Sequence, residues 1–171
     1  MRLALERRAV LSLGSNLGDR VATIGAALRA LEAIDGIRVL ERSSAWESPS
    51  WHPDGEGLQP DYVNVVAIIG TVLEPLDLLD ATQAVEVALG RDRTAGPAAE
   101  RYAARTIDID IVAIGDLVLD DERLTLPHPR AHERQFVLQP WIEVDPGATL
   151  PEHGSIAELA DYVDGDAWKL A

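Results

Sequence analysis

The chain has 171 residues, of which 47% are hydrophobic and 26% charged, and this composition is typical of one globular domain spanning residues 1–171. Its formal net charge of −14 argues against nucleic acid as a partner, because a phosphate backbone requires a basic face. The chain has no cysteine, which excludes disulfides and thiol nucleophiles, and no apolar run approaches the roughly 20 residues needed to span a bilayer.

Short apolar strands and amphipathic helices alternate along the first half of the chain. Periodicity and turn residues predict, in order, a strand over 9–13, a helix from Asp19 to about residue 34, a strand over 37–46, a strand over 62–71 and a helix over about 75–89. Residues 47–61, between the second and third strands, form a long loop rich in proline and glycine. Loops of this length in compact domains are often functional.

The second half begins with another loop, over residues 91–104, and continues with a strand over about 106–114. A turn at Gly115 leads to an extended segment over 117–119, and two short helices are expected over 134–142 and 156–162. The order β-α-β-β-α-β is the ferredoxin-like arrangement. We therefore expect an α+β fold with a ferredoxin-like core and an antiparallel sheet, extended by a C-terminal hairpin and helices.

The strand near residue 110 carries two aspartates with isoleucines between them. Because side chains alternate along a strand, Asp108 and Asp110 project from one face, about 7 Å apart, and the isoleucines project from the other. Two carboxylates on a buried strand are costly unless a cation meets them, and Mg²⁺ is the usual partner where phosphate is handled. The pair therefore predicts a metal-phosphate site, with a solvated edge strand as the simpler alternative.

Arginines are concentrated just before this acid pair. Four of them, Arg91, Arg93, Arg101 and Arg105, fall within fifteen positions that hold only two acids. Guanidinium groups suit phosphate oxygens, and a local cationic segment in an acidic protein favours a small anionic ligand over a polymer. We expect this loop to be open in the free protein and to close when a nucleotide supplies negative charge.

Several motifs, in order along the chain, together resemble one enzyme family. They are the turn Leu13-Gly14-Ser15-Asn16-Leu17-Gly18, the block Pro60-Asp61-Tyr62-Val63-Asn64, the segment from Arg101 to Val112 and the block from Arg123 to His128. The chain resembles, nearly end to end, the 6-hydroxymethyl-7,8-dihydropterin pyrophosphokinases. The resemblance implies transfer of diphosphate from ATP to the hydroxymethyl group of the pterin, with release of AMP, in folate biosynthesis. Because the short, charged N-terminus has no apolar region resembling a signal peptide, we expect a cytoplasmic enzyme, which we also expect to be monomeric and to have no nucleic acid or membrane partner.

The resemblance assigns roles to individual residues. Asp108 and Asp110 would bind two Mg²⁺ ions that bridge the ATP phosphates, and Arg91 and Arg105 would assist the transfer. The residues implied in ATP binding are Leu79, Gln83, Glu86, Arg93, Tyr102, Ile111, Arg123, Leu124, Thr125, His128 and Arg134. The residues implied in pterin binding are Ser48, Pro49, Trp51, Tyr62, Asn64 and Phe136. A flat ring edged by donors and acceptors suits this second set, because Asn64 offers both from one side chain.

Two departures from the family pattern affect the loops. Tyr102-Ala103-Ala104 stands where family members commonly carry Trp-Gly-Pro, which changes the stacking area and the backbone freedom of the arginine-rich loop. Trp51 stands where a leucine is common, on the pterin side. Neither departure touches the proposed metal ligands.

Other interpretations remain open from the residues alone. Tyr62 and Phe136 could be core aromatics, His128 an ordinary loop histidine and Arg134 a solvated helix charge. Another two-metal phosphoryl or nucleotidyl transferase would share the two aspartates without needing a pterin pocket. A non-catalytic ligand-binding regulatory domain with the same strand order would need neither the acid pair nor the arginine cluster. No P-loop motif is present, which excludes that mechanism.

Overall fold

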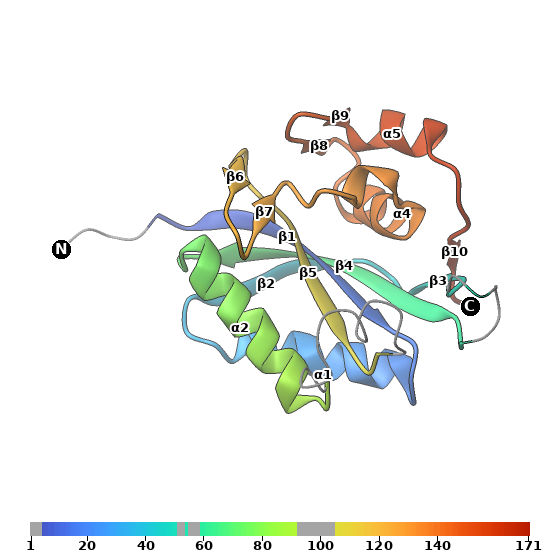
Figure 1. The fold of residues 1–171 in the computed structure, drawn as a ribbon, viewed down its shortest axis with the longest axis horizontal. Coiled ribbons are helices and arrows are strands. Elements are labelled where there is room, and N and C mark those ends of the chain that lie inside the picture. The colour runs from blue at the N-terminus through green and yellow to red at the C-terminus, as the bar shows by residue number, and fades with distance from the viewer. Residues whose placement is uncertain (1–4, 51–53, 55–58, 92–104) are drawn as a thin grey trace.

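A six-stranded antiparallel sheet runs through the middle of the molecule (Figure 1). The computed structural model describes residues 5–50, 54, 59–91 and 105–171. The strands of this sheet are β1 (Arg7–Ser15), β2 (Ile37–Arg42), β3 (Trp46–Ser48), β4 (Tyr62–Thr71), β5 (Asp108–Ile114) and β10 (Trp168–Lys169). They lie in the order β10-β3-β4-β1-β5, and β2 also pairs with β4. The expected antiparallel sheet in a mixed helix and strand domain is confirmed, with β1 and β4 at its centre.

One strand expected from the sequence, over 37–46, is two strands in the structure. β2 ends at Arg42 and β3 begins at Trp46. Between them, the backbone N–H of Ser43 donates to the Val66 carbonyl at 2.9 Å, and the Ser43 hydroxyl accepts from the Val66 N–H at 3.0 Å. The single-strand prediction was wrong because this serine side chain replaces a regular pairing, and a hydroxyl of that kind leaves no trace in hydrophobic periodicity.

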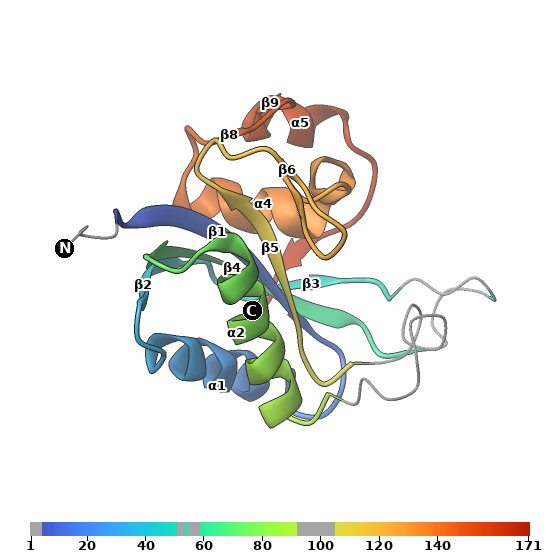
Figure 2. The ribbon, with the colours of Figure 1, turned by 60° about the vertical axis from the view of Figure 1, so that its left-hand side comes forward.

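Two helices, α1 (Arg20–Glu32) and α2 (Pro75–Ala88), cover one face of the sheet (Figures 1 and 2). Asp19 caps α1 as expected, because its carboxylate accepts from the Ala22 N–H at 3.0 Å. Pro75 occupies the first turn of α2, where a missing N–H costs nothing. The apolar residues of both helices join those of β1, β4 and β5 in the larger of two buried clusters, which includes Leu11, Leu13, Leu31, Val65, Leu78 and Ile109.

The C-terminal part of the chain covers the opposite face. Helices α4 (Gln135–Val144) and α5 (Ile156–Tyr162) lie above the sheet in Figure 2. Around them are the 3₁₀ turn η1 (Ala131–Glu133) and two hairpins, made by β6 (Leu119–Asp120) with β7 (Thr125–Leu126) and by β8 (Thr149–Leu150) with β9 (Gly154–Ser155). Both expected helices are confirmed, and α4 tolerates Pro140 within it. Two hairpins replace the single expected one.

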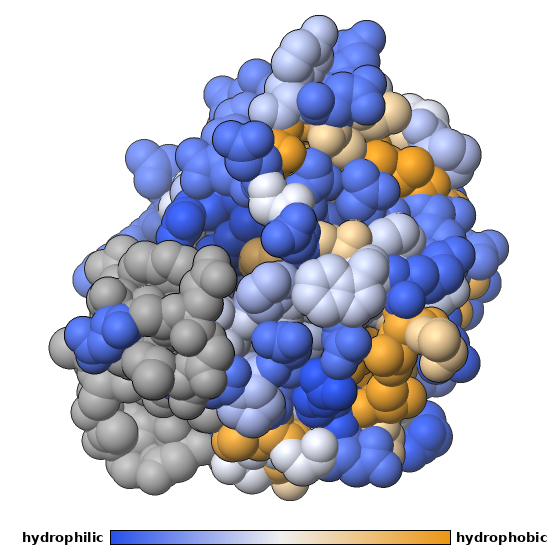
Figure 3. All heavy atoms as spheres, turned by 90° about the vertical axis from the view of Figure 1, so that its right-hand side faces the viewer, coloured by the Kyte–Doolittle hydropathy of each residue, from blue (hydrophilic) through white to orange (hydrophobic). Residues whose placement is uncertain are grey.

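The surface on the side of β10 is mainly hydrophilic, with apolar patches between the polar residues (Figure 3). In the described part of the chain, no helix is both long and apolar enough to cross a membrane.

The face of the sheet under α4 changes character along the strands. At one end, Val10, Val66 and Val112 belong to a second buried cluster with Leu138 and other residues of α4. Toward the other end, the residues two and four positions away on the same three strands include Ser12, Gly14, Asn64, Asp110 and Asp108, at positions that share that face by strand alternation. One sheet face therefore carries a packed apolar end and a polar end.

The packing of α4 on the sheet gives a first prediction. Leu138 is fully buried in the second cluster, so Leu138→Ala should lower the free energy of unfolding by about 2–5 kcal/mol. Tyr162 is 87% exposed at the end of α5, so Tyr162→Ala should change it by less than about 0.5 kcal/mol. Denaturant unfolding of the two variants measures both values. Equal stabilities would show that α4 does not stabilise the sheet.

Candidate active site

The strand register brings the two sets of predicted residues onto one row of the sheet. Gly14 of β1 lies directly between Asp108 of β5 and Asn64 of β4. A Cβ atom at Gly14 would lie 3.4 Å from Asn64 Oδ1 and 3.5 Å from Tyr62 Cδ1. Glycine therefore leaves the space over the middle strand open, between a carboxylate on one side and an amide and a phenol ring on the other.

Two arginines hold the carboxylate of Asp108. Arg91 Nη1 lies 2.5 Å from Asp108 Oδ1, and Arg105 Nη1 lies 2.9 Å from Oδ2. Both are charge-assisted hydrogen bonds, which are stronger than neutral ones. The structure therefore joins three of the four predicted catalytic residues directly, and the charge of Asp108 is met by guanidinium groups on both oxygens.

Glu86 lies behind this group, in the interior. Its carboxylate is 1% exposed, and Oε1 accepts both from Arg91 Nη1 at 2.9 Å and from the Ile109 N–H at 2.7 Å. It thereby connects α2 to the backbone of β5, one residue from Asp108. The resemblance implied that Glu86 faces the nucleotide, whereas in the structure these contacts direct it to Arg91 and the strand.

Asp110, the fourth predicted catalytic residue, has weaker contacts. Its Oδ2 lies 3.6 Å from Arg134 Nη1 and 3.7 Å from His128 Nε2. Burial raises the pKa of the Asp110 carboxyl to about 7, the nearby Asp108 carboxylate adds to the rise, and Arg134 opposes it. This carboxylate is therefore the less well compensated of the two, and added positive charge would stabilise its ionised form.

His128 is neutral at neutral pH. Burial, and after it the positive charge of Arg134, lower its pKa to about 4. Its Nδ1 accepts from the Arg130 N–H at 3.1 Å, so the ring proton is on Nε2, the atom that faces Asp110. The contact with Asp110 thus places a neutral N–H beside a carboxyl group whose own pKa is raised to about 7.

Asn64, which the resemblance assigns to pterin binding, lies beside Ser48 of the same predicted set. This amide is almost fully buried, and its Nδ2 donates to the Ser48 hydroxyl at 2.8 Å and to the Trp46 carbonyl at 3.4 Å. These bonds fix the orientation of the amide. Burial raises the pKa of the Tyr62 hydroxyl, Arg105 opposes the rise and Asp108 adds to it, and the Tyr62 ring lies beside Gly14.

Phe136, predicted to bind pterin, contacts Arg134, which is predicted to bind ATP. The guanidinium carbon of Arg134 lies 5.4 Å from the centroid of the Phe136 ring, within the range of a cation–π interaction. Arg134 also faces Asp110. Phe136, at the start of α4, is therefore placed near the acid pair and is only partly buried.

The remaining nucleotide-side residues lie on α2, β5 and the β6–β7 hairpin. Leu79, Ile111 and Leu124 all pack in the larger core cluster, and Gln83 is half-buried on α2. The side chain of Ile111 points away from the acid pair. Any contact between Ile111 and a ligand on the acid-pair face would therefore use the backbone of β5, the last strand of the sheet.

On the hairpin, Arg123 and Thr125 are exposed. Arg123 forms an ion pair with Asp80 of α2, which joins the hairpin to that helix.

Some predicted residues lie outside the described part of the chain. These are Trp51, Arg93 and Tyr102, together with most of the arginine-rich loop and its expected closure. Ser48 is described and lies at the end of β3, and Pro49 is described next to it.

Sequence reasoning missed the part played by Asn16, which was assigned only to a turn. It is 1% exposed, and its side chain bonds to residues at the ends of both long loops. The only signal in the sequence is an amide between two turn glycines, and such residues are common in turns without distant partners.

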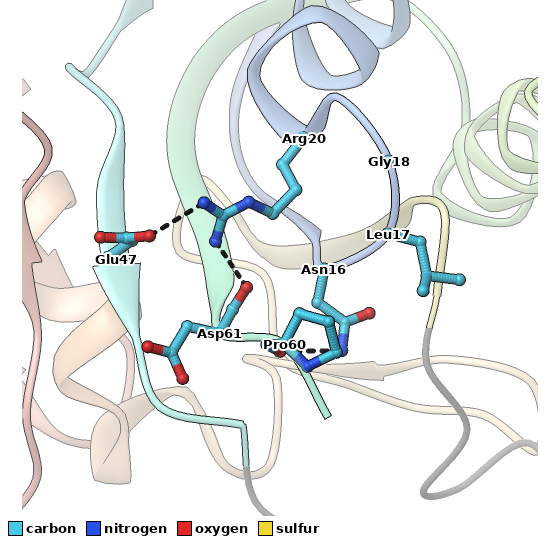
Figure 4. A pocket seen from close by; sticks show the side chains of 7 residues that line it. All are labelled: Asn16, Leu17, Gly18, Arg20, Glu47, Pro60 and Asp61. Atoms are coloured by element: carbon cyan, nitrogen blue, oxygen red, sulfur yellow. Dashed lines mark hydrogen bonds and ion pairs between the residues drawn. The ribbon is translucent and has the colours of Figure 1, made fainter. Parts of the chain in front are cut away.

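The hollow beside Asn16 is not the acid-pair site. It is lined by Asn16, Leu17, Gly18, Arg20, Glu47, Pro60 and Asp61 (Figure 4). Arg20 fills part of it, because its guanidinium bonds to Glu47 at 2.9 Å and to the Asp61 carbonyl at 2.7 Å.

The donors near the acid pair suit a metal shared with a substrate. Asp108 and Asp110 provide carboxylate oxygens, and within the described ranges no group of three or more acidic, histidine or cysteine side chains is placed to hold a metal. Mg²⁺ keeps several waters and commonly takes only one or two carboxylates plus substrate phosphates. The residues therefore fit Mg²⁺ that arrives with a nucleotide better than a metal held by protein alone.

Comparisons with known proteins agree with the motifs. A family model described as 7,8-dihydro-6-hydroxymethylpterin-pyrophosphokinase (HPPK) matches residues 10–146. A 2-amino-4-hydroxy-6-hydroxymethyldihydropteridine pyrophosphokinase of Haemophilus influenzae is 40% identical over 163 residues, which cover 95% of this chain and 97% of the relative. A relative of the same name from Methylorubrum extorquens is 42% identical over 143 residues, or 84% and 85% of the two chains.

A solved structure is also similar. The Plasmodium falciparum HPPK-DHPS structure with pterin and p-hydroxybenzoate has a TM-score of 0.67 and 14% identity, and the match covers 92% of this chain and 42% of that one. At this identity the similarity shows the fold alone, and this chain spans less than half the length of that protein.

The position of Glu86 gives a second prediction. Glu86→Ala removes a buried partner from both Arg91 and the Ile109 N–H, so the free energy of unfolding should fall by about 3–5 kcal/mol. Val87→Ala, at the exposed neighbouring position of α2, should change it by less than about 0.5 kcal/mol. Calorimetric or denaturant unfolding distinguishes them. A Glu86→Ala protein as stable as the wild type would mean that these bonds do not support the site.

Proposed function

The chain belongs to the 7,8-dihydro-6-hydroxymethylpterin-pyrophosphokinase family, and we propose that the row from Asp108 through Gly14 to Asn64 is its reaction site. It is an ATP-dependent enzyme of folate biosynthesis, which transfers diphosphate from ATP to the hydroxymethyl group of 6-hydroxymethyl-7,8-dihydropterin and releases AMP. The interpretation as a pyrophosphokinase is thus confirmed over a regulatory domain or another phosphoryl transferase. The observation that carries the site is the placement of a carboxylate and a buried amide on one sheet face, separated by a glycine.

The chemistry of the transfer explains why the carboxylate of Asp108 and the amide of Asn64 must stand apart at fixed positions. The hydroxymethyl oxygen of the pterin attacks the β-phosphorus of ATP and gives up its proton, and the bond from that phosphorus to the oxygen shared with the α-phosphate breaks, so that AMP leaves. Attacking and leaving oxygens lie roughly in line on either side of the phosphorus. An enzyme for this transfer needs ring-binding and phosphate-binding groups at a set spacing, and the strand register supports that spacing here.

On the pterin side, we assign the ring edge to Asn64 and the ring faces to Tyr62 and Phe136. Asn64 Nδ2 donates to Ser48 and to the backbone, so these bonds turn Oδ1, which lies beside Gly14, toward the proposed ring edge as an acceptor. Ser48 and Pro49 form the near wall, at the end of β3. Trp51 completes this set by resemblance alone.

On the phosphate side, we assign Mg²⁺ to Asp108 and Asp110. When bound, the two ions neutralise phosphate charge and orient the triphosphate for in-line transfer. The two carboxylates share one face of β5, and the raised pKa of Asp110 reflects a carboxylate that needs positive charge. The nearby N–H of His128 and the guanidinium of Arg134 would then face the phosphates.

Arg91 and Arg105 have a double part in this proposal. In the structure both bond to Asp108. If Asp108 held a metal, phosphate oxygens would offer these guanidinium groups acceptors that suit their forked geometry. The arginines would then stabilise negative charge that develops during transfer, and Glu86 would hold Arg91 in place meanwhile.

The nucleotide would lie along α2, β5 and the β6–β7 hairpin. Arg123 and Thr125 of the hairpin are exposed there, Leu79 and Leu124 form the apolar side, and the β5 backbone at Ile111 offers hydrogen-bonding groups. Gln83 lies on α2 one turn before Glu86, which places a polar amide beside this apolar side. Arg93 and Tyr102 join this set by resemblance.

The finer features of the fold are proposals too. We propose a ferredoxin-like core, supported by the order β5-β1-β4-β2 with α1 and α2 on one face. We also propose, as expected from the sequence, a monomer that acts in the cytoplasm.

The acid pair gives the third prediction. Asp108→Ala and Asp110→Ala should each lower kcat by more than about 100-fold, because each removes a group that holds the charge-stabilising ions. Asp116→Ala is the matched control, since this exposed acid follows the same strand without facing the site. AMP release, measured with ATP, Mg²⁺ and the pterin, reports all three. Activity within tenfold of wild type in either variant would refute the metal assignment.

The fourth prediction concerns Asn64. Asn64→Ala should weaken pterin binding by on the order of 1–3 kcal/mol, or roughly 5- to 150-fold in Kd, and leave ATP binding nearly unchanged. Ser48→Ala removes the partner that orients the amide and should cause a smaller loss of the same kind. Calorimetry with each ligand measures the two affinities. Equal losses for ATP and pterin would indicate a folding defect and not a pterin contact.

A further inference from the structure

Asn16 lies where β1 ends and joins two loops that are far apart in the sequence. Its side-chain Oδ1 accepts from the Arg105 backbone N–H at 2.7 Å, and its backbone N–H donates to the Arg105 carbonyl at 3.2 Å. These two bonds form a short backbone bridge to the residue that ends the arginine-rich loop. Asn16 thus fixes the backbone from which the Arg105 side chain reaches Asp108.

The other end of the Asn16 amide holds the loop that leads into β4. Its Nδ2 donates to the Pro60 carbonyl at 3.2 Å and to Gln59 Oε1 at 3.4 Å, and Figure 4 shows the Asn16 side chain turned toward Pro60. Tyr62, the first residue of β4, follows two positions after Pro60. The amide therefore contacts both the phosphate-side loop and the start of the pterin-side strand.

The chemistry of this position requires an amide. The side chain accepts one bond from Arg105 and donates two toward Gln59 and Pro60, and asparagine is the shortest side chain with that inventory. An aspartate would keep the acceptor but lose both donors and place a carboxylate against a carbonyl oxygen. At 1% exposure, water cannot replace the lost partners freely.

We propose that Asn16 is a positioning residue, which sets Arg105 of the phosphate side at a fixed place relative to Tyr62 and Asn64 of the pterin side. The inference rests on the proposed function of Arg105 and of the pterin pocket. A single amide bonded to both segments transmits a displacement of one to the other. Because in-line transfer depends on where Arg105 stands relative to the bound pterin, displacing Arg105 by about 1 Å should lower kcat by on the order of 100-fold, whereas loosening the Pro60 end should act mainly on the KM for pterin.

A double-mutant cycle tests the link to Arg105. Asn16→Ala should lower kcat about 10- to 100-fold when Arg105 is present, and less than about threefold in an Arg105→Ala background, because the effect acts through that arginine. Asp19→Ala is the matched control: it removes the cap of α1 in the same turn and leaves the bonds of Asn16 in place. Its kcat should stay within about twofold of wild type at a temperature where all variants are folded.

A second variant separates the two ends of the amide. Asn16→Asp retains the acceptor for the Arg105 N–H and loses the donors to Pro60 and Gln59, so it should raise the KM for pterin more than it lowers kcat. If Asn16→Ala does not fold, the same cycle run with Asn16→Asp decides the question. In that cycle the rise in pterin KM should be the same with and without Arg105, while the loss of kcat should depend on Arg105.

Each outcome discriminates. The inference would be overturned if Asn16→Ala lowered kcat by the same factor with and without Arg105. It would also be overturned if Asn16→Ala lowered kcat no more than Asp19→Ala does. Asn16 would then be a purely structural residue. If Arg105→Ala alone leaves kcat unchanged, the assigned role of Arg105 is wrong, which is a failure of the proposed function and is visible before Asn16 is altered.

Discussion

The structure of the site depends on one chain of alternating charges, Glu86–Arg91–Asp108–Arg105. Each charge is largely withdrawn from water, and each is stabilised by its neighbour of opposite sign. Because Glu86 also accepts from the backbone of β5, the chain anchors α2 to the strand at the position of the acid pair. Core packing alone would hold α2 against β5, but it would not fix the position of Arg91 beside Asp108.

A second constraint is the division of one sheet face into an apolar and a polar end. Valines of three strands pack under α4 at one end, while glycine, asparagine and aspartate occupy the continuing positions at the other. The same strands therefore provide rigidity and chemistry. Side chains at a site gain precision when they stand on packed strands, because their backbone cannot drift.

The sequence predicted what depends on local alternation. Asp108 with Asp110, and Tyr62 with Asn64, share faces because each pair is two residues apart on a strand, and most helix limits followed from caps and periodicity. It did not predict that the Glu86 side chain points into the interior toward Arg91, because helical spacing shows which face a residue is on but not its partner. It also did not predict the interruption between β2 and β3 at Ser43. The partners of Asn16 lie 43 to 89 residues away in the sequence, and no local pattern encodes a contact between residues that far apart.

The spacing of the strands on either side of Gly14 also fixes a distance within the site. Neighbouring strands lie about 4.8 Å apart, so Asp108 and Asn64, on either side of β1, stand roughly 10 Å apart across the sheet. This width belongs to the backbone and not to any flexible side chain, so it cannot adapt to ligands of other lengths. A synthetic molecule meant to occupy both ends at once would need a planar polar ring and an anionic group separated by about that span, joined by a linker slim enough to pass over a glycine.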